Sequence, residues 1–285
     1  MRDVDERTIT DAVIRAMADG GDERLRSVLA ALVRHLHDFA REVELTPAEW
    51  MAAIGFLTRT GHKSSDTRQE FILLSDTLGL SSLVDLIAGR GGEAATEASN
   101  LGPFYIEGAP MLPVGGDLIR GNEGQPGVVR GRVLDEAGKP VAGVTLDIWQ
   151  NAANGFYSNE DPDQDDMNLR CRMVTGADGA YAFTTIRPTP YTVPYDGPVG
   201  EMLRATGRHA WRPAHLHFRL AADGFADLVT EIFPEDDRYV DEDAVFGVRR
   251  SLAVPFPPAD KATAARWKLS PPCFDLVYDF RLRRA

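Results

Sequence analysis

The N-terminal third of the chain contains a long stretch with the apolar spacing of an amphipathic helix. Between Glu23 and Glu42, apolar residues recur three and four positions apart, and neither Pro nor Gly interrupts them. The pattern predicts one helix with an apolar stripe from Leu25 to Phe39. Such a stripe forms either the core of a helical bundle or a surface through which two chains associate. The pattern alone leaves both interpretations open.

Further helices are expected on either side of this pattern up to about residue 100. Thr46-Pro47-Ala48-Glu49 combines a capping box with Pro at the first helical position, which predicts a helix running to about Thr60. A third helix is expected over roughly Asp66 to Leu78, where Gly79 follows. A fourth, shorter helix is expected over Ser82 to Ala88.

After Asn100 the helical spacing gives way to short apolar runs separated by Gly, Pro and Asp. The runs that predict strands lie at 128–134, 144–149, 172–175, 181–186, 215–220, 228–233 and 276–282. Strands that follow one another without intervening helices predict an antiparallel sandwich or barrel. We therefore expect a helical region over residues 1–100 and a mainly β domain over residues 101–285.

Composition narrows the classes of partner and the compartment. The chain has 285 residues and a net charge of −12, which disfavours nucleic acid and anionic membranes as partners. No apolar run approaches the ~18 residues of a membrane-spanning helix, and the first residues contain no apolar signal segment. Cys171 and Cys273 are too few for a disulfide framework. We expect a cytoplasmic protein whose metal, if it has one, is held by nitrogen and oxygen donors.

A pair of histidines provides the first candidate chemistry. His215 and His217 lie two positions apart on a predicted strand, so their side chains leave the same face and can share one metal ion. The alternative is a half-buried strand that carries two hydrogen-bonded histidines.

Two tyrosines upstream are candidate partners for this pair. Tyr157 follows the predicted strand that ends at Trp149, and Tyr191 lies in a proline-rich loop that leads toward the histidines. A phenol with a pKa of ~10 becomes a good ligand only when a highly charged cation removes its proton. Each tyrosine is otherwise a packed aromatic residue with a hydrogen-bonded hydroxyl.

Three segments together resemble the intradiol ring-cleaving dioxygenases, which act on catechols. They are Gly155-Phe-Tyr157-Ser158, Tyr191-Thr-Val-Pro194 and Gly207-Arg-His-Ala-Trp-Arg212-Pro-Ala-His215-Leu-His217. The likeness covers most of the chain, including 101–105, 147–150 and 243–246. It implies a two-sheet β-sandwich preceded by a helical segment that forms a homodimer interface, where a phospholipid is often bound.

The resemblance also implies a cofactor and roles for particular residues. It implies one non-haem Fe(III) per chain, held by Tyr157, Tyr191, His215 and His217. Tyr195 is the less suitable alternative to Tyr191, which holds the family's distance to the first histidine. Tyr191 is further implied to accept a substrate proton, and Arg212 to stabilise negative charge on the aromatic ring. From the chain alone, the alternative interpretation of Arg212 is a surface residue at a strand end.

Within the family, the chain is most similar to enzymes that open hydroxyquinol (benzene-1,2,4-triol) with O2 to give maleylacetate. Asp76 is suited to accept a hydrogen bond from the third ring hydroxyl, although it also fits a solvent-facing helix position. The same likeness suggests that the pocket walls are Leu73, Pro103, Phe104, Val193 and Val245. Catechol or chlorocatechol is the alternative substrate.

Three observations leave questions open. Catechol-cleaving relatives usually carry Gln where this chain has Glu231, in Leu228-Val-Thr-Glu231, so the role of Glu231 is undetermined. The segment 131–143 also occurs in transthyretin-like modules that only bind. A zinc hydrolase would use the two histidines with a carboxylate.

Overall fold

The computed structural model describes residues 4–18, 21–65, 68–90, 92 and 94–285. The chain divides into two compact units between Arg59 and Thr60. In the described residues the last of the N-terminal helices ends at Ala88, and the first strand begins at Gly116.

Three helices begin in the first unit: α1 (Ile9–Ala16), α2 (Glu23–Glu42) and α3 (Pro47–Lys63). The predicted bounds of α2 are confirmed, and the Asp22 side chain accepts a hydrogen bond of 2.9 Å from the backbone N–H of Leu25 at its start. The capping box of α3 is also confirmed. Glu49 accepts from the backbone N–H of Thr46 at 2.9 Å, and the Thr46 hydroxyl accepts from the N–H of Glu49 at 3.3 Å.

The second unit starts with two short helices, α4 (Glu70–Thr77) and α5 (Leu80–Ala88). Helix α4 begins later than expected, and Asp66, the expected start, lies outside the described residues. No single described helix is long and apolar enough to cross a membrane, although the bent pair of α4 and α5 meets the length and composition criteria together.

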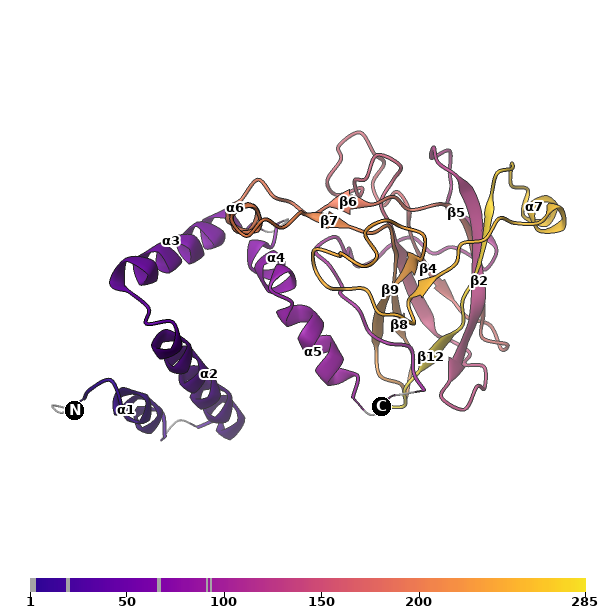
Figure 1. Cartoon of the computed structure of the whole chain (residues 1–285). Helices are drawn as coiled ribbons and strands as arrows, with labels where there is room; N and C mark the ends of the chain where they lie inside the picture. Colours follow the sequence, from indigo (N-terminus) through magenta and orange to yellow (C-terminus); the bar gives the residue numbers. More distant parts are fainter. Residues whose placement is uncertain (1–3, 19–20, 66–67, 91, 93) are drawn as a thin grey trace. The chain divides into compact units, whose positions relative to one another are not determined.

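Two five-stranded sheets follow, together with a two-stranded ribbon (Figure 1). The first sheet has the order β1-β5-β2-β11, with β12 also paired to β2, and the second has the order β10-β9-β8-β3-β4. The bounds in the first sheet are β1 116–117, β2 126–135, β5 180–186, β11 274–277 and β12 280–282. Those in the second sheet are β3 145–149, β4 170–174, β8 216–221, β9 228–234 and β10 253–254, and the ribbon joins β6 191–192 to β7 211–212.

The expectation of purely antiparallel sheets is wrong, because both sheets are mixed. β1 pairs parallel to β5, β11 and β12 pair parallel to β2, and β10 pairs parallel to β9. Each of these strands reaches its neighbour through a long connection rather than a hairpin, and a long connection allows a parallel return. The local spacing of apolar residues does not show where a strand pairs after a long connection.

The predicted sandwich domain also contains two helices that the strand pattern did not indicate. They are α6 (Pro198–Ala205) and α7 (Lys261–Trp267). Both are short, and α6 starts with Pro198 in its first turn after the extended residue Gly197. They occupy long connections between strands, where the sequence shows no repeated apolar stripe.

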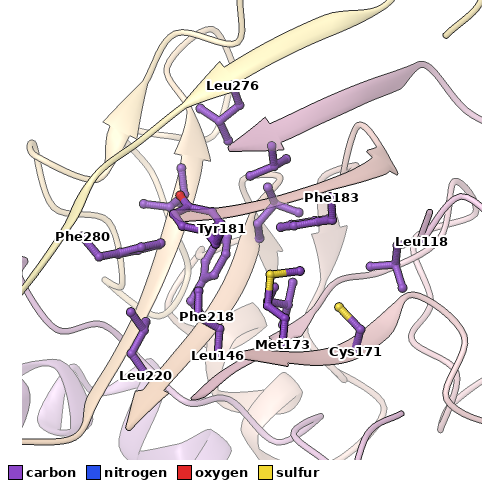
Figure 2. Close-up of a cluster of buried hydrophobic side chains, with 14 of the residues drawn as sticks. Leu118, Leu146, Cys171, Met173, Tyr181, Phe183, Phe218, Leu220, Leu276 and Phe280 are labelled. Carbon is purple, nitrogen blue, oxygen red and sulfur yellow. The ribbon is translucent and has the colours of Figure 1, made fainter. Parts of the chain in front are cut away.

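The chain passes back and forth between the two sheets, and their inward side chains form one core between them. β2 and β5 lie in the first sheet, whereas β3, β4 and β8 lie in the second. Figure 2 shows Tyr181 and Phe183 from one sheet together with Leu146 and Phe218 from the other. Because Leu216, Phe218 and Leu220 are packed in this core, the intervening residues of β8 project from the opposite face.

Candidate metal centre

The paired histidines lie on that opposite face of β8. His215 immediately precedes the strand and His217 is its second residue, and the two side chains are at most 2% exposed. Their Nε2 atoms are 3.1 Å apart. The expectation that the two rings leave the same face is confirmed.

Hydrogen bonding and burial leave the histidines suited to bind a cation. The Nδ1 atom of His215 lies 2.8 Å from the carbonyl oxygen of Pro213, which can only accept, so Nδ1 carries the proton and Nε2 a lone pair. Burial lowers the pKa of His215 to about 4, and it lowers the pKa of His217 well below its usual value. Both imidazoles are therefore neutral at physiological pH, as metal ligation requires.

Both predicted tyrosines reach the same point from separate segments. Tyr157, in the turn after β3, is completely buried and places its hydroxyl 3.3 Å from Nε2 of His215. Tyr191, in β6, is 6% exposed, and its ring centroid lies 5.5 Å from that of Tyr157. Tyr195, the alternative, is 50% exposed. Three segments far apart in the sequence thus bring two phenols and two imidazoles together.

The donor set fits a hard, trivalent cation. Burial raises the pKa of Tyr191 to about 12 and raises the pKa of Tyr157 well above its usual value. The phenols therefore stay protonated unless a strong positive charge compensates the phenolates. Two phenolates and two neutral imidazoles supply hard donors of the kind that Fe(III) favours, and no thiolate lies among them.

A second possible set replaces the tyrosines with Glu231. One donor atom each from His215, His217 and Glu231 lie within 4.8 Å of one another. Both oxygens of this carboxylate are already hydrogen-bonded, however, because Nη1 and Nη2 of Arg212 donate to them at 2.8 and 3.0 Å. The Ser99 hydroxyl donates to Oε2 as well, at 2.6 Å. The Tyr157 hydroxyl instead lies 3.3 Å from Nε2 of His215 and forms no ion pair with a described side chain, so the tyrosines are the better candidates.

Arg212 lies beside the four donors rather than on the surface. It is 3% exposed, and its Nη1 atom is 3.2 Å from Nε2 of His215. Besides Glu231 it contacts Asp243, to which Nε and Nη2 donate at 3.1 Å each. Although burial favours the neutral form, the two carboxylates hold the pKa of Arg212 well above its usual value. The interpretation as a surface residue is therefore wrong.

All six predicted pocket residues line one narrow cavity next to these groups. The cavity is lined by Leu73, Asp76, Asn100, Gly102, Pro103, Phe104, Tyr191, Val193, Pro194, Arg212 and Val245. Asp76 is 5% exposed, so it does not face solvent, and burial raises the pKa of its carboxyl. Phe104 stacks on Tyr157 with ring centroids 4.5 Å apart, which makes one wall aromatic.

Sequence reasoning missed Arg170, which supports the turn containing Tyr157. Arg170 is 1% exposed, and its Nη1 donates to the carbonyl oxygen of Phe104 at 2.6 Å. Its Nε donates to the Ser158 hydroxyl at 3.0 Å, and its Nη2 donates to Asn159 at 2.8 Å. The side chain thereby ties the turn to the cavity wall. A single Arg at the start of a strand carries no sequence signal of this kind.

Comparison with known proteins gives matches over nearly the whole chain. The family model described as "Dioxygenase" matches residues 101–284, and "Catechol dioxygenase N terminus" matches residues 22–96. The 6-chlorohydroxyquinol 1,2-dioxygenase of Cupriavidus pinatubonensis is 49% identical, covering 88% of this chain and 91% of the relative. The hydroxyquinol 1,2-dioxygenase of a Rhizobium species is 46% identical, covering 92% and 89%. The crystal structure of hydroxyquinol 1,2-dioxygenase from Pseudomonas putida DLL-E4 superposes with a TM-score of 0.91 at 48% identity, covering 98% of this chain and 99% of that one.

Proposed function

Because the chain belongs to the intradiol ring-cleavage dioxygenases, we propose that it opens hydroxyquinol between its two adjacent hydroxyl-bearing carbons. O2 is the second substrate, and the product is maleylacetate. The observation that carries this proposal is the buried Asp76 carboxyl in the cavity that also contains Tyr191 and Arg212. Residues 101–285 form the catalytic domain in this proposal.

Tyr157, Tyr191, His215 and His217 would hold the iron. When bound, Fe(III) supplies Lewis acidity that draws electron density from the aromatic ring and prepares it for reaction with O2. A diol that binds through both oxygens must lose two protons. Tyr191 lines the cavity, so its oxygen is placed to accept one of them. Tyr157 does not line the cavity and stays a ligand.

Arg212 contributes a cation oriented toward the reacting ring. All but one of its N–H groups point to the carboxylates of Glu231 and Asp243. The remaining N–H, on Nη1, faces Nε2 of His215. A metal bound to Nε2 of His215 would occupy the lone pair of that nitrogen. The N–H on Nη1 of Arg212 would then be available to donate to a negatively charged substrate atom. A donor fixed before the reaction stabilises developing charge without reorganisation.

The apolar cavity walls exclude water, and Asp76 discriminates between diols. Phe104, Val193 and Val245 are each at most 6% exposed. Asp76 accepts a hydrogen bond from Ser81, and a carboxyl has room for a second donor. The third hydroxyl of hydroxyquinol can supply that donor, whereas catechol has no hydroxyl at this position.

We expect kcat/KM for hydroxyquinol to exceed that for catechol, and Asp76→Leu to reduce this ratio by about 10–100-fold. Oxygen uptake with each substrate measures the ratio. The matched control is Asp85→Leu, because Asp85 lies on the neighbouring helix α5 and lines a different cavity. A wild-type preference for catechol would contradict the proposed substrate, and an unchanged ratio in Asp76→Leu would contradict the role of Asp76.

The assembly in this proposal is a homodimer formed through the N-terminal helices, with a phospholipid at the interface and the protein in the cytoplasm. The stripe on α2 supports it, because Leu25, Leu32 and Leu36 are each at least 50% exposed. No residue of α2 is buried. An exposed apolar stripe of this length is typical of an association surface.

Leu32→Glu on this stripe is expected to convert a dimer into a monomer, which sedimentation equilibrium measures directly. A charge in an apolar interface costs several times the free energy of burying one leucine. Arg34→Glu, an exposed position on the other side of α2, is the control and should leave the dimer intact. A wild-type protein that sediments as a monomer contradicts the proposed assembly.

A further inference from the structure

Glu231 lies directly across the sheet from one of the candidate ligands. In the antiparallel pairing of β8 with β9, the Cα partner of His217 is Glu231, so both side chains project from the same face. The Glu231 side chain is completely buried. A carboxylate in such a place must be compensated, because an isolated buried charge is very unfavourable.

Arg212 and the Ser99 hydroxyl compensate the charge of Glu231. Two N–H groups of Arg212 bind the two Glu231 oxygens, and Ser99 donates to Oε2. Three donors on its two oxygens offset the cost of burying this carboxylate. The pair is bidentate, which fixes the plane of the guanidinium as well as its position.

The backbone around this cluster is shaped to admit it. A Cβ atom at Gly247 would lie 2.7 Å from Nη2 of Arg212 and 2.8 Å from Oε2 of Glu231. The N–H of Gly247 instead donates to Asp243 at 2.9 Å. Arg212 thus has little freedom to turn, and its direction depends on its two carboxylates.

Glu231 also brings negative charge to both histidines. Its Oε1 atom lies 3.4 Å from Nδ1 of His217 and 3.5 Å from Nε2 of His215. A carboxylate this close to both imidazoles makes the electrostatic potential at the candidate metal position more negative. Gln at this position would keep the shape of the side chain without the charge.

We propose that Glu231 is a positioning residue that fixes Arg212 with one N–H toward His215 and supplies a permanent negative charge beside both histidines. The inference rests on the proposed function, because it concerns the same site. It assigns two separable effects to one carboxylate: one on the orientation of Arg212 and one on the electronic character of the centre.

Glu231→Gln separates the charge from the shape. The variant should bind iron as wild type does, but its phenolate-to-iron absorption band should move to longer wavelength. The band reports an electron moving toward the metal, and a nearby negative charge opposes that movement. We expect kcat for hydroxyquinol to fall by about 10–100-fold with little change in KM, because Arg212 acts on charge that develops during the reaction.

Two further variants distinguish the two effects. Glu231→Asp keeps the charge but is too short to bind Arg212 at two points, so kcat should fall while the band stays in place. Asp243→Asn removes the charge of the second carboxylate that binds Arg212. Among the described side chains, Asp243 forms no ion pair with either histidine. This variant should give the same result as Glu231→Asp.

An unmoved band in iron-loaded Glu231→Gln overturns the electronic part of the proposal, and unchanged kcat values overturn the positioning part. A Glu231→Gln protein that does not fold or holds no iron also counts against it, because the carboxylate would then be needed for the structure itself. A wild-type protein without iron and colour contradicts the proposed function instead. The two failures are therefore distinguishable.

Discussion

Replacing Tyr157 with Phe is expected to abolish most of the visible absorption and to lower kcat/KM by more than about 100-fold, since even partners behind a ligand cost 10–100-fold. Tyr157 is completely buried, and its ring stacks on Phe104, a contact that Phe preserves. The substitution therefore removes one oxygen donor without opening a cavity. Iron content, the absorption spectrum and oxygen uptake measure the effect.

Tyr181→Phe is the matched control for this variant. Tyr181 is also buried, and its hydroxyl donates to the carbonyl oxygen of Tyr278 at 2.7 Å in the sandwich core. Losing that bond should reduce the free energy of unfolding by about 1 kcal/mol and leave colour and activity unchanged. If Tyr157→Phe kept the iron and the full colour of the wild type, Tyr157 would not be a ligand.

Replacing Arg212 with Met is expected to reduce the free energy of unfolding by about 3–5 kcal/mol, in addition to removing activity. The substitution leaves Glu231 and Asp243 as neighbouring buried carboxylates without their cation. Urea unfolding monitored by tryptophan fluorescence measures the loss. Arg130→Met is the control, because Arg130 forms an equally bidentate pair with Asp275 at 2.8 Å but is 42% exposed. An exposed pair contributes at most about 1 kcal/mol.

The loss of unfolding free energy in Arg212→Met should increase as the pH rises. Without the cation, burial raises the pKa of Glu231 above that of the unfolded chain. The folded state then binds more protons, so its stability falls as the pH rises through this raised pKa. The variant should be closer to wild type at pH 5 than at pH 8. Equal losses of unfolding free energy in Arg212→Met and Arg130→Met would show that burial adds nothing to the cost of removing the Arg212 cation.

The elements with strong local signals were predictable from the sequence. The stripe of α2 and the capping box of α3 are local signals, so they specify where these helices lie. Alternation along β8 was sufficient to place His215 and His217 on one face. The family motifs then pointed to Tyr157 and Tyr191, which spacing alone could not connect to the histidines.

What the sequence did not reveal depends on contacts between distant segments. The parallel edge strands β10, β11 and β12 return after long connections, and no local pattern records where they pair. The surroundings of Glu231 depend on the register of β8 with β9, which puts it across from His217. Arg170 likewise gains its role only when the turn and the cavity wall meet.

The central claim is that two phenol oxygens and two imidazole nitrogens hold one ferric ion. The most direct test measures metal content and visible absorption of freshly purified protein together. We expect close to one iron per chain and a red-brown absorption band from phenolate-to-iron charge transfer that dithionite bleaches. Colourless protein without iron, or chelated protein whose activity returns with zinc, would contradict it.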